Sequence, residues 1–364
     1  MKMVFSDDYI NRSLSEDIEI LERIISSFHI ARESKELSNI KVTLGGWSKY
    51  GWEARQQPIY KALLDSDIAG LHKILSKFFI DPSAYGIALG KDEFDGITSN
   101  KKNTNNYLKK WTIILHEISY LLNAKIVPNP EIESHNWNKR YSLTIEELVN
   151  KIEKKTLLPI SFPQICGVFG PNIRGNAIPE LALHYYLVAE WCKQLVFSYP
   201  ANVIEIGGGF GGLAFYMANQ NNFKYTIYDL DFGTAIQAYF LNRALPPESI
   251  TLFGESKLNS FRLYPSWCLL SQKFDNFNQE VSLLINQDCL TDVDPSIAKQ
   301  YSESLTKRLN GFVLSIGPDR SGSNIDWKGC PAGYFFESIS NLKRIERSHY
   351  NLRPGYMREL FISR

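Results

Sequence analysis

Glu205-Ile206-Gly207-Gly208-Gly209-Phe210-Gly211-Gly212 is the stretch of this 364-residue chain that decides its fold. It continues the short apolar run Val203-Ile204 and leads into a segment that reads as a helix from Gly212. A buried strand that ends in glycines and runs into a helix lets a ligand approach the backbone closely. In an open α/β sheet this edge is where nucleotides bind. The stretch therefore predicts a strand, a ligand-binding glycine loop and a helix.

The next strand carries the second half of the pattern. Residues 225–228 are predicted to form it, and Asp229 ends it about 20 residues after the first glycine. A carboxylate at this place can accept hydrogen bonds from both ribose hydroxyls of an adenosine. The register of strand, glycines, helix and acid argues against a plain glycine-rich turn that binds no ligand.

Two kinds of cofactor fit the loop. Gly207, Gly209 and Gly212 satisfy the G-x-G-x-x-G pattern of dinucleotide sites. Glu205, Gly207, Gly209 and Gly211 satisfy E/D-x-G-x-G-x-G, the signature of S-adenosylmethionine sites. We favour the second, because an acid before the loop suits a ligand with a sulfonium and an ammonium group. The predicted cofactor-binding residues are Glu205, Gly207, Gly208, Gly209, Gly211 and Asp229.

The rest of the C-terminal half alternates between strands and helices, which implies a parallel α/β sheet. A closing antiparallel strand pair, the usual end of a methyltransferase sheet, is predicted at the C-terminus. We therefore expect a Rossmann-like class I methyltransferase fold, with seven mostly parallel strands and an antiparallel C-terminal strand. Further strands are predicted over residues 250–253, 281–285, 312–316, 342–346 and 356–363, and helices over 180–197, 235–244 and from 295.

The first half of the chain is predicted to be mainly helical. Apolar residues recur at helical spacing near residues 18–28, 68–78 and 111–122, and Thr144 with Glu147 forms a capping box. Residues 91–106 are polar and without periodicity, which predicts a mobile loop. Another irregular stretch is predicted from Pro128.

A segment rich in proline and glycine, residues 159–171, marks the predicted domain boundary. We expect a helical region over residues 1–165, for acceptor recognition or oligomerisation, and a cofactor-binding methyltransferase domain over 166–364. The residues leave the oligomeric state open, and a homo-oligomer is compatible with them.

Composition excludes several classes of protein. Lys and Arg total 40 against 39 Asp and Glu, so a dedicated nucleic-acid binder is not expected. Five dispersed cysteines without a C-x-x-C pair fit a reducing compartment better than a disulfide scaffold or a zinc knuckle. No apolar run reaches the ~18 residues that a membrane span needs. The expected location is cytoplasmic.

Residues 206–246 resemble the core of the bacterial sugar O-methyltransferase family, found with surface-polysaccharide biosynthesis. The shared features are the glycine triplet, the following F-G-G-L-A, a strand ending in Y-D-L, and a helix that contains Gln237-Ala-Tyr239-Phe240-Leu241 and ends near Pro246. Residues 285–292 are similar to a second family segment, in which Cys289 replaces Ser and Asp292 replaces Glu. The resemblance implies transfer of a methyl group to a sugar or glycan hydroxyl, with S-adenosylhomocysteine as product. It adds Asn286 to the predicted cofactor-binding residues.

A sugar hydroxyl is a poor nucleophile until a base takes its proton. Two candidates are His184, on the helix before the first strand, and Asp288, after the fourth. Each has a structural alternative: His184 can pair with Glu180 one helical turn away, which we weigh above catalysis, and Asp288 can cap a loop. Asp288, Asp292 and Asp294 alternate, but Asp294 is better placed as a helix cap, so no metal site is predicted.

Three other functions stay open. One is a methyltransferase acting on a secondary metabolite. Another is an NAD(P)-dependent oxidoreductase that uses the same glycine loop. The last is a catalytically inactive subunit that keeps the pocket and scaffolds a glycan-assembly complex.

Overall fold

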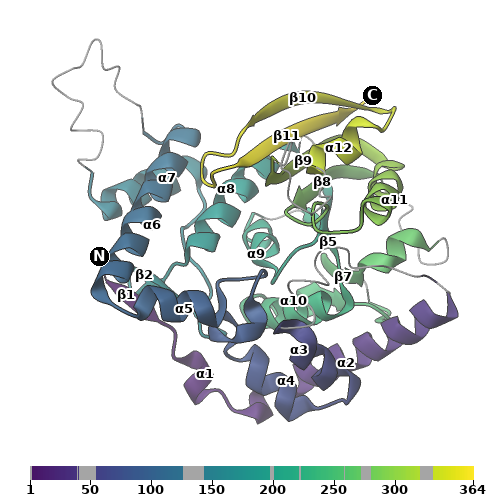
Figure 1. The fold of residues 1–364 in the computed structure, drawn as a ribbon, viewed down its shortest axis with the longest axis horizontal. Coiled ribbons are helices and arrows are strands. Elements are labelled where there is room, and N and C mark those ends of the chain that lie inside the picture. Colours follow the sequence, from purple (N-terminus) through teal and green to yellow (C-terminus); the bar gives the residue numbers. More distant parts are fainter. Residues whose placement is uncertain are drawn as a thin grey trace.

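The computed structural model describes residues 2–38, 40, 55–125, 143–196, 201–220, 223–257, 259–271, 280–319 and 331–364. The irregular stretch predicted from Pro128 lies outside them. An eight-stranded sheet lies at the centre, with helices on both faces (Figure 1). Helices of the first half pack around one side of this core, and the last two strands form the opposite edge of the sheet.

The strand order is β10-β11-β9-β8-β4-β5-β7-β6. Strands β4 to β9 run parallel, whereas β11 lies antiparallel between β9 and β10. This is the predicted Rossmann-like methyltransferase fold, with one strand, β7, more than the seven expected. The bounds are β4 (Ala201–Ile206), β5 (Phe223–Asp229), β6 (Ile250–Leu252), β7 (Phe261–Pro265), β8 (Val281–Gln287), β9 (Leu309–Pro318), β10 (Leu342–His349) and β11 (Tyr356–Ser363).

Helices cover the two faces of this sheet unequally. The side chains of α8, α9 and α10 pack into one large buried cluster, and those of α11 and α12 into a second cluster across the sheet. The sequence predicted four of these helices, and α10 begins a turn earlier than expected. The bounds are α8 (Glu180–Leu195), α9 (Gly212–Ala218), α10 (Asp231–Ala244), α11 (Pro295–Thr306) and α12 (Ala332–Glu337).

The first half is mainly helical, as predicted. Thr144 and Glu147 cap α7 in the expected reciprocal way. A small sheet of β1 (Met3–Phe5), β2 (Phe169–Ile173) and β3 (Asn176–Ala177) joins the start of the chain to residues beyond the predicted boundary. The helices are α1 (Asp8–Asn11), α2 (Leu14–Leu37), α3 (Gln57–Leu64), α4 (Ile68–Leu75), α5 (Gly90–Thr98), α6 (Lys101–Leu121) and α7 (Ile145–Thr156).

The mobile loop predicted over residues 91–106 is wrong, because these residues form most of α5 and the start of α6. The side chain of Asn100 caps α6 by accepting a hydrogen bond of 2.9 Å from the backbone N–H of Asn103. Most side chains of the stretch are exposed, so few apolar positions were present to show a helical period. The cap was therefore the signal that sequence analysis missed.

One hydrophobic core extends through both halves. Leu21 and Trp111 of the first half belong to the same buried cluster as Phe210 and Leu360. No helix in the described part of the chain is long and apolar enough to cross a bilayer.

Candidate cofactor and acceptor site

The glycine loop joins β4 to α9 in a backbone shape that side chains would disfavour. Gly207, Gly209 and Gly211 have φ values of +75°, +57° and +95°. A Cβ on Gly207 would lie 2.2 Å from the Cβ of Cys289, so the loop rests directly on the turn after β8. A Cβ on Gly209 would meet nothing closer than the carbonyl oxygen of Ile87, at 3.6 Å. The loop is thus closely packed at Gly207 and has room for additional atoms at Gly209.

Asp229 ends β5 and faces this loop, as predicted. Its Oδ1 accepts a hydrogen bond of 2.7 Å from the backbone N–H of Leu230, and its Oδ2 accepts one of 2.5 Å from Gln237. Burial raises the pKa of Asp229 to about 6, against the lowering effect of these donors and of the Gly208 and Gly209 amides. The carboxylate therefore stays largely ionised near neutral pH.

Glu205 lies beneath the loop and is only 1% exposed. Its Oε2 accepts a hydrogen bond of 2.9 Å from the hydroxyl of Tyr225 on the neighbouring strand. Burial raises the pKa of Glu205 to about 8; the Tyr225 bond opposes the rise and the charge of Asp229 adds to it. The two predicted carboxyl groups thus differ, with Glu205 mostly protonated at neutral pH.

Asn286, the last of the predicted cofactor-binding residues, forms hydrogen bonds to other protein groups through its side-chain amide. Its Nδ2 donates to the hydroxyl of Ser315 at 3.1 Å, and its Oδ1 accepts from the backbone N–H of Leu290 at 3.0 Å. The residue is fully buried. These bonds hold the turn that carries Cys289 under Gly207, and a direct contact with a cofactor stays a prediction.

His184 lies buried on α8 between two partners. Its Nδ1 is 2.9 Å from the hydroxyl of Tyr350, and its Nε2 is 3.8 Å from Glu180 Oε1. The Glu180 carboxylate also pairs with Lys110 of α6 at 2.8 Å. The pairing with Glu180 that the sequence suggested is present. Tyr350, which follows β10, was missed because it is 166 residues away in sequence.

Asp288 follows β8 with a left-handed backbone (φ +63°) and pairs with the guanidinium of Arg353. That guanidinium lies over the ring of Tyr356, 4.0 Å from its centroid. The carboxylate of Asp288 therefore has a positive charge directly beside it. Among the described residues, no group of three His, Cys, Asp or Glu side chains is placed to hold a metal ion.

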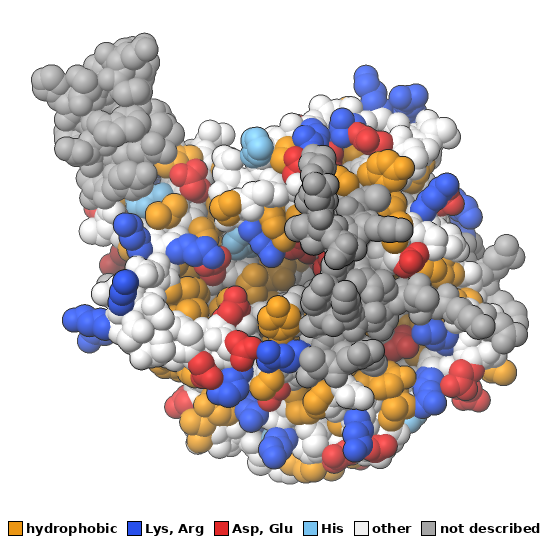
Figure 2. Space-filling view, viewed as in Figure 1, with side chains coloured by type: hydrophobic (Ala, Val, Ile, Leu, Met, Phe, Trp, Pro, Cys, Tyr) orange, Lys and Arg blue, Asp and Glu red, His pale blue; other side chains and the backbone are white. Residues whose placement is uncertain are grey.

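Tyr185 of α8 lies beside the glycine loop. A Cβ on Gly209 would lie 3.7 Å from its hydroxyl, and its ring packs edge-on against Phe210. Burial raises the pKa of Tyr185, and the charges of Asp288, Arg353 and Asp229 also act on its hydroxyl. The face of the molecule drawn in Figure 2 has a hollow near its middle, with hydrophobic side chains inside and charged side chains around its rim. No local sequence pattern indicated Tyr185.

The first half of the chain forms a wall of the site through the segment around Ile87. Gln56 donates to the carbonyl oxygens of Ser83 and Tyr85, at 3.3 and 2.8 Å, and so fixes this segment. The guanidinium of Arg55 lies over the ring of Tyr85. The helical region is thereby brought to the glycine loop.

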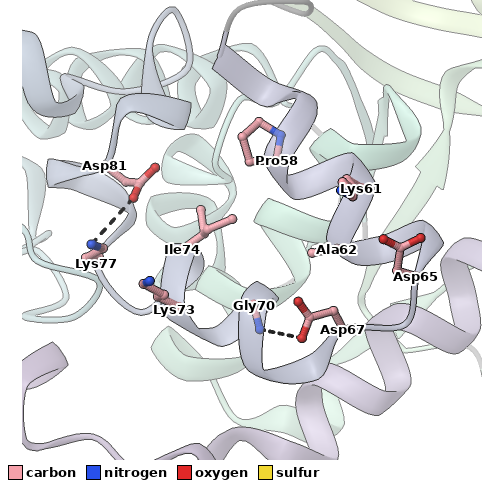
Figure 3. A pocket seen from close by; sticks show the side chains of 10 residues that line it. All are labelled: Pro58, Lys61, Ala62, Asp65, Asp67, Gly70, Lys73, Ile74, Lys77 and Asp81. Carbon is pink, nitrogen blue, oxygen red and sulfur yellow. Dashed lines mark hydrogen bonds and ion pairs between the residues drawn. The ribbon is translucent and has the colours of Figure 1, made fainter.

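A second groove lies away from this site, between α3, α4 and the segment that follows α4 (Figure 3). Its charged lining consists of three lysines and three aspartates, so it has no excess charge that would select an ion. Asp67 is occupied in capping α4 through the N–H of Gly70, and Lys77 pairs with Asp81 at 3.9 Å. None of the predicted site residues lines this groove.

No protein-family model matches the sequence, and no curated protein matches it. Among solved structures, the chain is similar to the glycopeptide N-methyltransferase MtfA complexed with S-adenosyl-L-methionine. The two share 12% identity and a TM-score of 0.36 over 50% of this chain and 94% of MtfA. The CcbJ methyltransferase from Streptomyces caelestis gives 12% identity and a TM-score of 0.35 over 50% of this chain and 89% of that one. At these values the similarities carry no argument about function, and the fold assignment rests on the strand order itself.

Proposed function

We propose that the protein is an S-adenosylmethionine-dependent O-methyltransferase whose acceptor is a hydroxyl of a sugar or glycan. The observation that carries the proposal is the arrangement at the carboxyl end of β4 and β5. There an acidic strand end, a loop of left-handed glycines and Asp229 come together in a sheet with the reversed strand β11. A dinucleotide-binding sheet of the doubly wound type is mostly parallel, so the reversed strand favours the methyltransferase.

The residues present fit this cofactor. The open side of the loop, at Gly209, would receive it, and Asp229 would accept hydrogen bonds from its ribose hydroxyls. Glu205, beneath the loop, would face its positive charges. When bound, the sulfonium supplies an activated methyl group that leaves with S-adenosylhomocysteine as the product.

The chain's own residues supply a route for the acceptor proton. The hydroxyl of Tyr350 lies 2.9 Å from His184 Nδ1, and the charges of Arg353 and Asp288 also act on it. We assign proton transfer from the acceptor hydroxyl to the Tyr350 oxygen, while Tyr350 passes its own proton to Nδ1 of His184. Glu180 then stabilises the imidazolium that forms. The acceptor oxygen takes the methyl group as it loses its proton.

The helical first half, predicted from the sequence as residues 1–165, is the proposed acceptor-recognition region. Lys110 of α6 pairs with Glu180 at 2.8 Å. Burial and the Glu180 charge raise the pKa of Glu93 of α5, and the charge of Lys110 lowers it. The sugar nature of the acceptor and the link to polysaccharide synthesis rest on the resemblance of residues 206–246. The proposed location is cytoplasmic.

Two measurements test the proposal. Calorimetric titration should show binding of S-adenosylhomocysteine and not of NAD(P); no binding at millimolar concentration would refute it. Transfer of a labelled methyl group should then be measured with candidate glycans and with small secondary metabolites. Transfer only to the metabolites would change the acceptor class. Cofactor binding without turnover on any acceptor would favour an inactive scaffolding subunit.

A further inference from the structure

A buried glutamine on α10 joins the two parts of the proposed cofactor site. The Nε2 of Gln237 donates to the carbonyl oxygen of Gly209 at 3.0 Å and to Oδ2 of Asp229 at 2.5 Å. The side chain is 0% exposed. Both partners can only accept here, so the amide nitrogen must face them, and the orientation of the amide group is fixed.

The other end of the same amide is unsatisfied. Oε1 of Gln237 is buried and has no hydrogen-bond partner in the described part of the chain. A buried acceptor without a donor costs free energy relative to an apolar atom in its place. Stability alone therefore does not explain a glutamine at this position. Its amide nitrogen, however, binds the Gly209 carbonyl and the Asp229 carboxylate, two groups that a ligand in the proposed site would contact. Such unsatisfied groups in native proteins call for an explanation, and functional sites supply one.

We infer that Gln237 is a positioning residue that holds the Gly209 backbone and the Asp229 carboxylate in the geometry that binds the cofactor. The inference rests on the proposed function and adds a residue that the sequence did not assign to the site. The loop follows β4 and Asp229 ends β5, so Gln237 adds a side-chain link between them to the contacts that Asp229 makes with the Gly208 and Gly209 amides. Gly233 leaves the space that Asp229 needs, since a Cβ there would lie 2.8 Å from Oδ1.

The first test separates positioning from stability with Gln237→Met, which keeps the length of the side chain. We expect a small loss of thermal stability, because the lone Oε1 is removed while the Gly209 carbonyl and the Asp229 carboxylate lose a donor. Affinity for S-adenosylhomocysteine should be at least about tenfold lower, a decade being ~1.4 kcal/mol. Gln300→Met on α11 is the matched control, because that exposed amide only donates to Ser296 within its own helix. It should change neither quantity. Unchanged affinity in Gln237→Met, or a loss of stability large enough to explain the weaker binding, would overturn the inference.

The second test uses Gln237→Glu, which replaces the donor by a carboxyl group. At neutral pH two carboxylates would repel each other, and at lower pH one protonated carboxyl could again donate to the other. Affinity of this variant should rise as the pH falls from about 7.5 to about 5.5, whereas wild-type affinity should fall as Asp229 is protonated. Glu205, Tyr185 and Cys289 also face Asp229 and are the same in both proteins. Parallel pH profiles would contradict a positioning role.

The two proposals fail in different ways. If the wild type does not bind S-adenosylhomocysteine at all, the proposed function fails. If the wild type binds it and Gln237→Met binds it equally well, only the role of Gln237 fails. A double-mutant cycle with Asp229→Ala should show strong coupling, because each substitution removes the same bond. Additive losses of affinity would argue against the link.

Discussion

At the scale of single residues, the site combines two buried carboxyl groups that hold their protons differently. Burial raises the pKa of Glu205 to about 8 and that of Asp229 to about 6. The difference follows from the number of donors: Glu205 has the Tyr225 hydroxyl, whereas Asp229 has Gln237 and several backbone amides. Asp229 can thus accept hydrogen bonds as a carboxylate near neutral pH, while Glu205 is mostly neutral until a cation approaches.

Replacement of Asp229 by Ala should weaken binding of S-adenosylhomocysteine by about tenfold or more. Each hydrogen bond from a ribose hydroxyl to the carboxylate is worth ~1.5–3 kcal/mol, and ~1.4 kcal/mol is one decade. Asp231→Ala is the control, because Asp231 opens α10 and pairs with Lys35 at 3.8 Å. A calorimetric titration measures both. Unchanged affinity in Asp229→Ala, or a larger loss in Asp231→Ala, would show that the ribose is not held here.

The stability of the protein should depend on pH through Glu205. The unfolded chain releases this proton near the ordinary pKa of 4.5, whereas the folded protein keeps it to about 8. The unfolded state therefore binds fewer protons in this window, and stability falls as the pH rises through it. Glu205→Gln keeps an acceptor for Tyr225 and removes the titration. Its melting temperature relative to the wild type should be several degrees higher near pH 8.5 than near pH 5. Parallel curves for the two proteins would contradict the raised pKa.

Local sequence predicted the cofactor residues but not their long-range partners. Glu205, the glycines and Asp229 stand in one short stretch whose spacing has a physical meaning. Tyr350 reaches His184 only because β10 and β11 return to the sheet beside α8, and no local pattern indicates that return. Tyr185 likewise looked like an ordinary helix residue.

At the scale of elements, periodicity predicted the apolar helices and the buried strands and failed where an element is polar. The residues of α5 and of the first turns of α6 are mostly exposed, so no apolar stripe was visible. Strand β7 alternates buried and half-buried residues, with Arg262 and Tyr264 on the less buried face. The arginine and the final proline hid a strand that pairs with both β5 and β6.

Two glycine variants should distinguish the effect of backbone strain from that of a side chain that blocks the cofactor. Gly209→Ala and Gly175→Ala both place a side chain at a left-handed φ, +57° and +89°, and should each cost about 1–2 kcal/mol of stability. Gly175 is the control, because it is far from the loop in sequence and nothing lies within 4 Å of a Cβ placed on it. The methyl group on Gly209 would stand in the proposed cofactor space between the loop, Ile87 and Tyr185.

Thermal unfolding and calorimetric titration should be measured on both glycine variants. We expect similar losses of stability and a loss of S-adenosylhomocysteine binding, about tenfold or more, in Gly209→Ala only. Equal affinities in the two variants would mean that the cofactor does not lie over the middle of the loop.

At the scale of the whole molecule, α10 connects the two halves of the chain. Gln237 reaches the glycine loop, whereas Tyr239 and Arg243 of the same helix bind the first residues of the chain. The hydroxyl of Tyr239 donates to Asp17 at 2.5 Å, and the guanidinium of Arg243 pairs with Asp8. The proline-rich composition of residues 159–171 predicted a boundary, but it held no information about contacts that cross it.

Loss of Arg243 should destabilise the entire molecule. Its side chain is 3% exposed, and Arg243→Ala would leave Asp8 without its partner and remove a cation–π contact with Tyr239. Because the Asp8 side chain is 30% exposed, the cost should be smaller than the roughly 3–5 kcal/mol of a fully buried pair, and larger than that of an exposed pair. Arg32→Ala is the control, since the exposed pair of Arg32 with Glu36 at 3.2 Å is worth at most about 0.5 kcal/mol. Denaturant unfolding should show one cooperative transition that shifts only in Arg243→Ala. Equal shifts of the unfolding midpoint in the two variants would show that Arg243 does not hold the start of the chain to α10.

The contacts between α2 and the far half of the chain also determine when the protein can finish folding on a ribosome. Asp17 meets Tyr239 across 222 residues, and Arg23 meets Glu255 across 232. Synthesis proceeds at about 5–20 residues per second, so α2 waits on the order of ten seconds or more for these partners. Throughout that time its apolar side, with Leu21, Ile25 and Phe28, has no finished core to enter. The nascent chain is therefore expected to need a chaperone until α10 has left the exit tunnel.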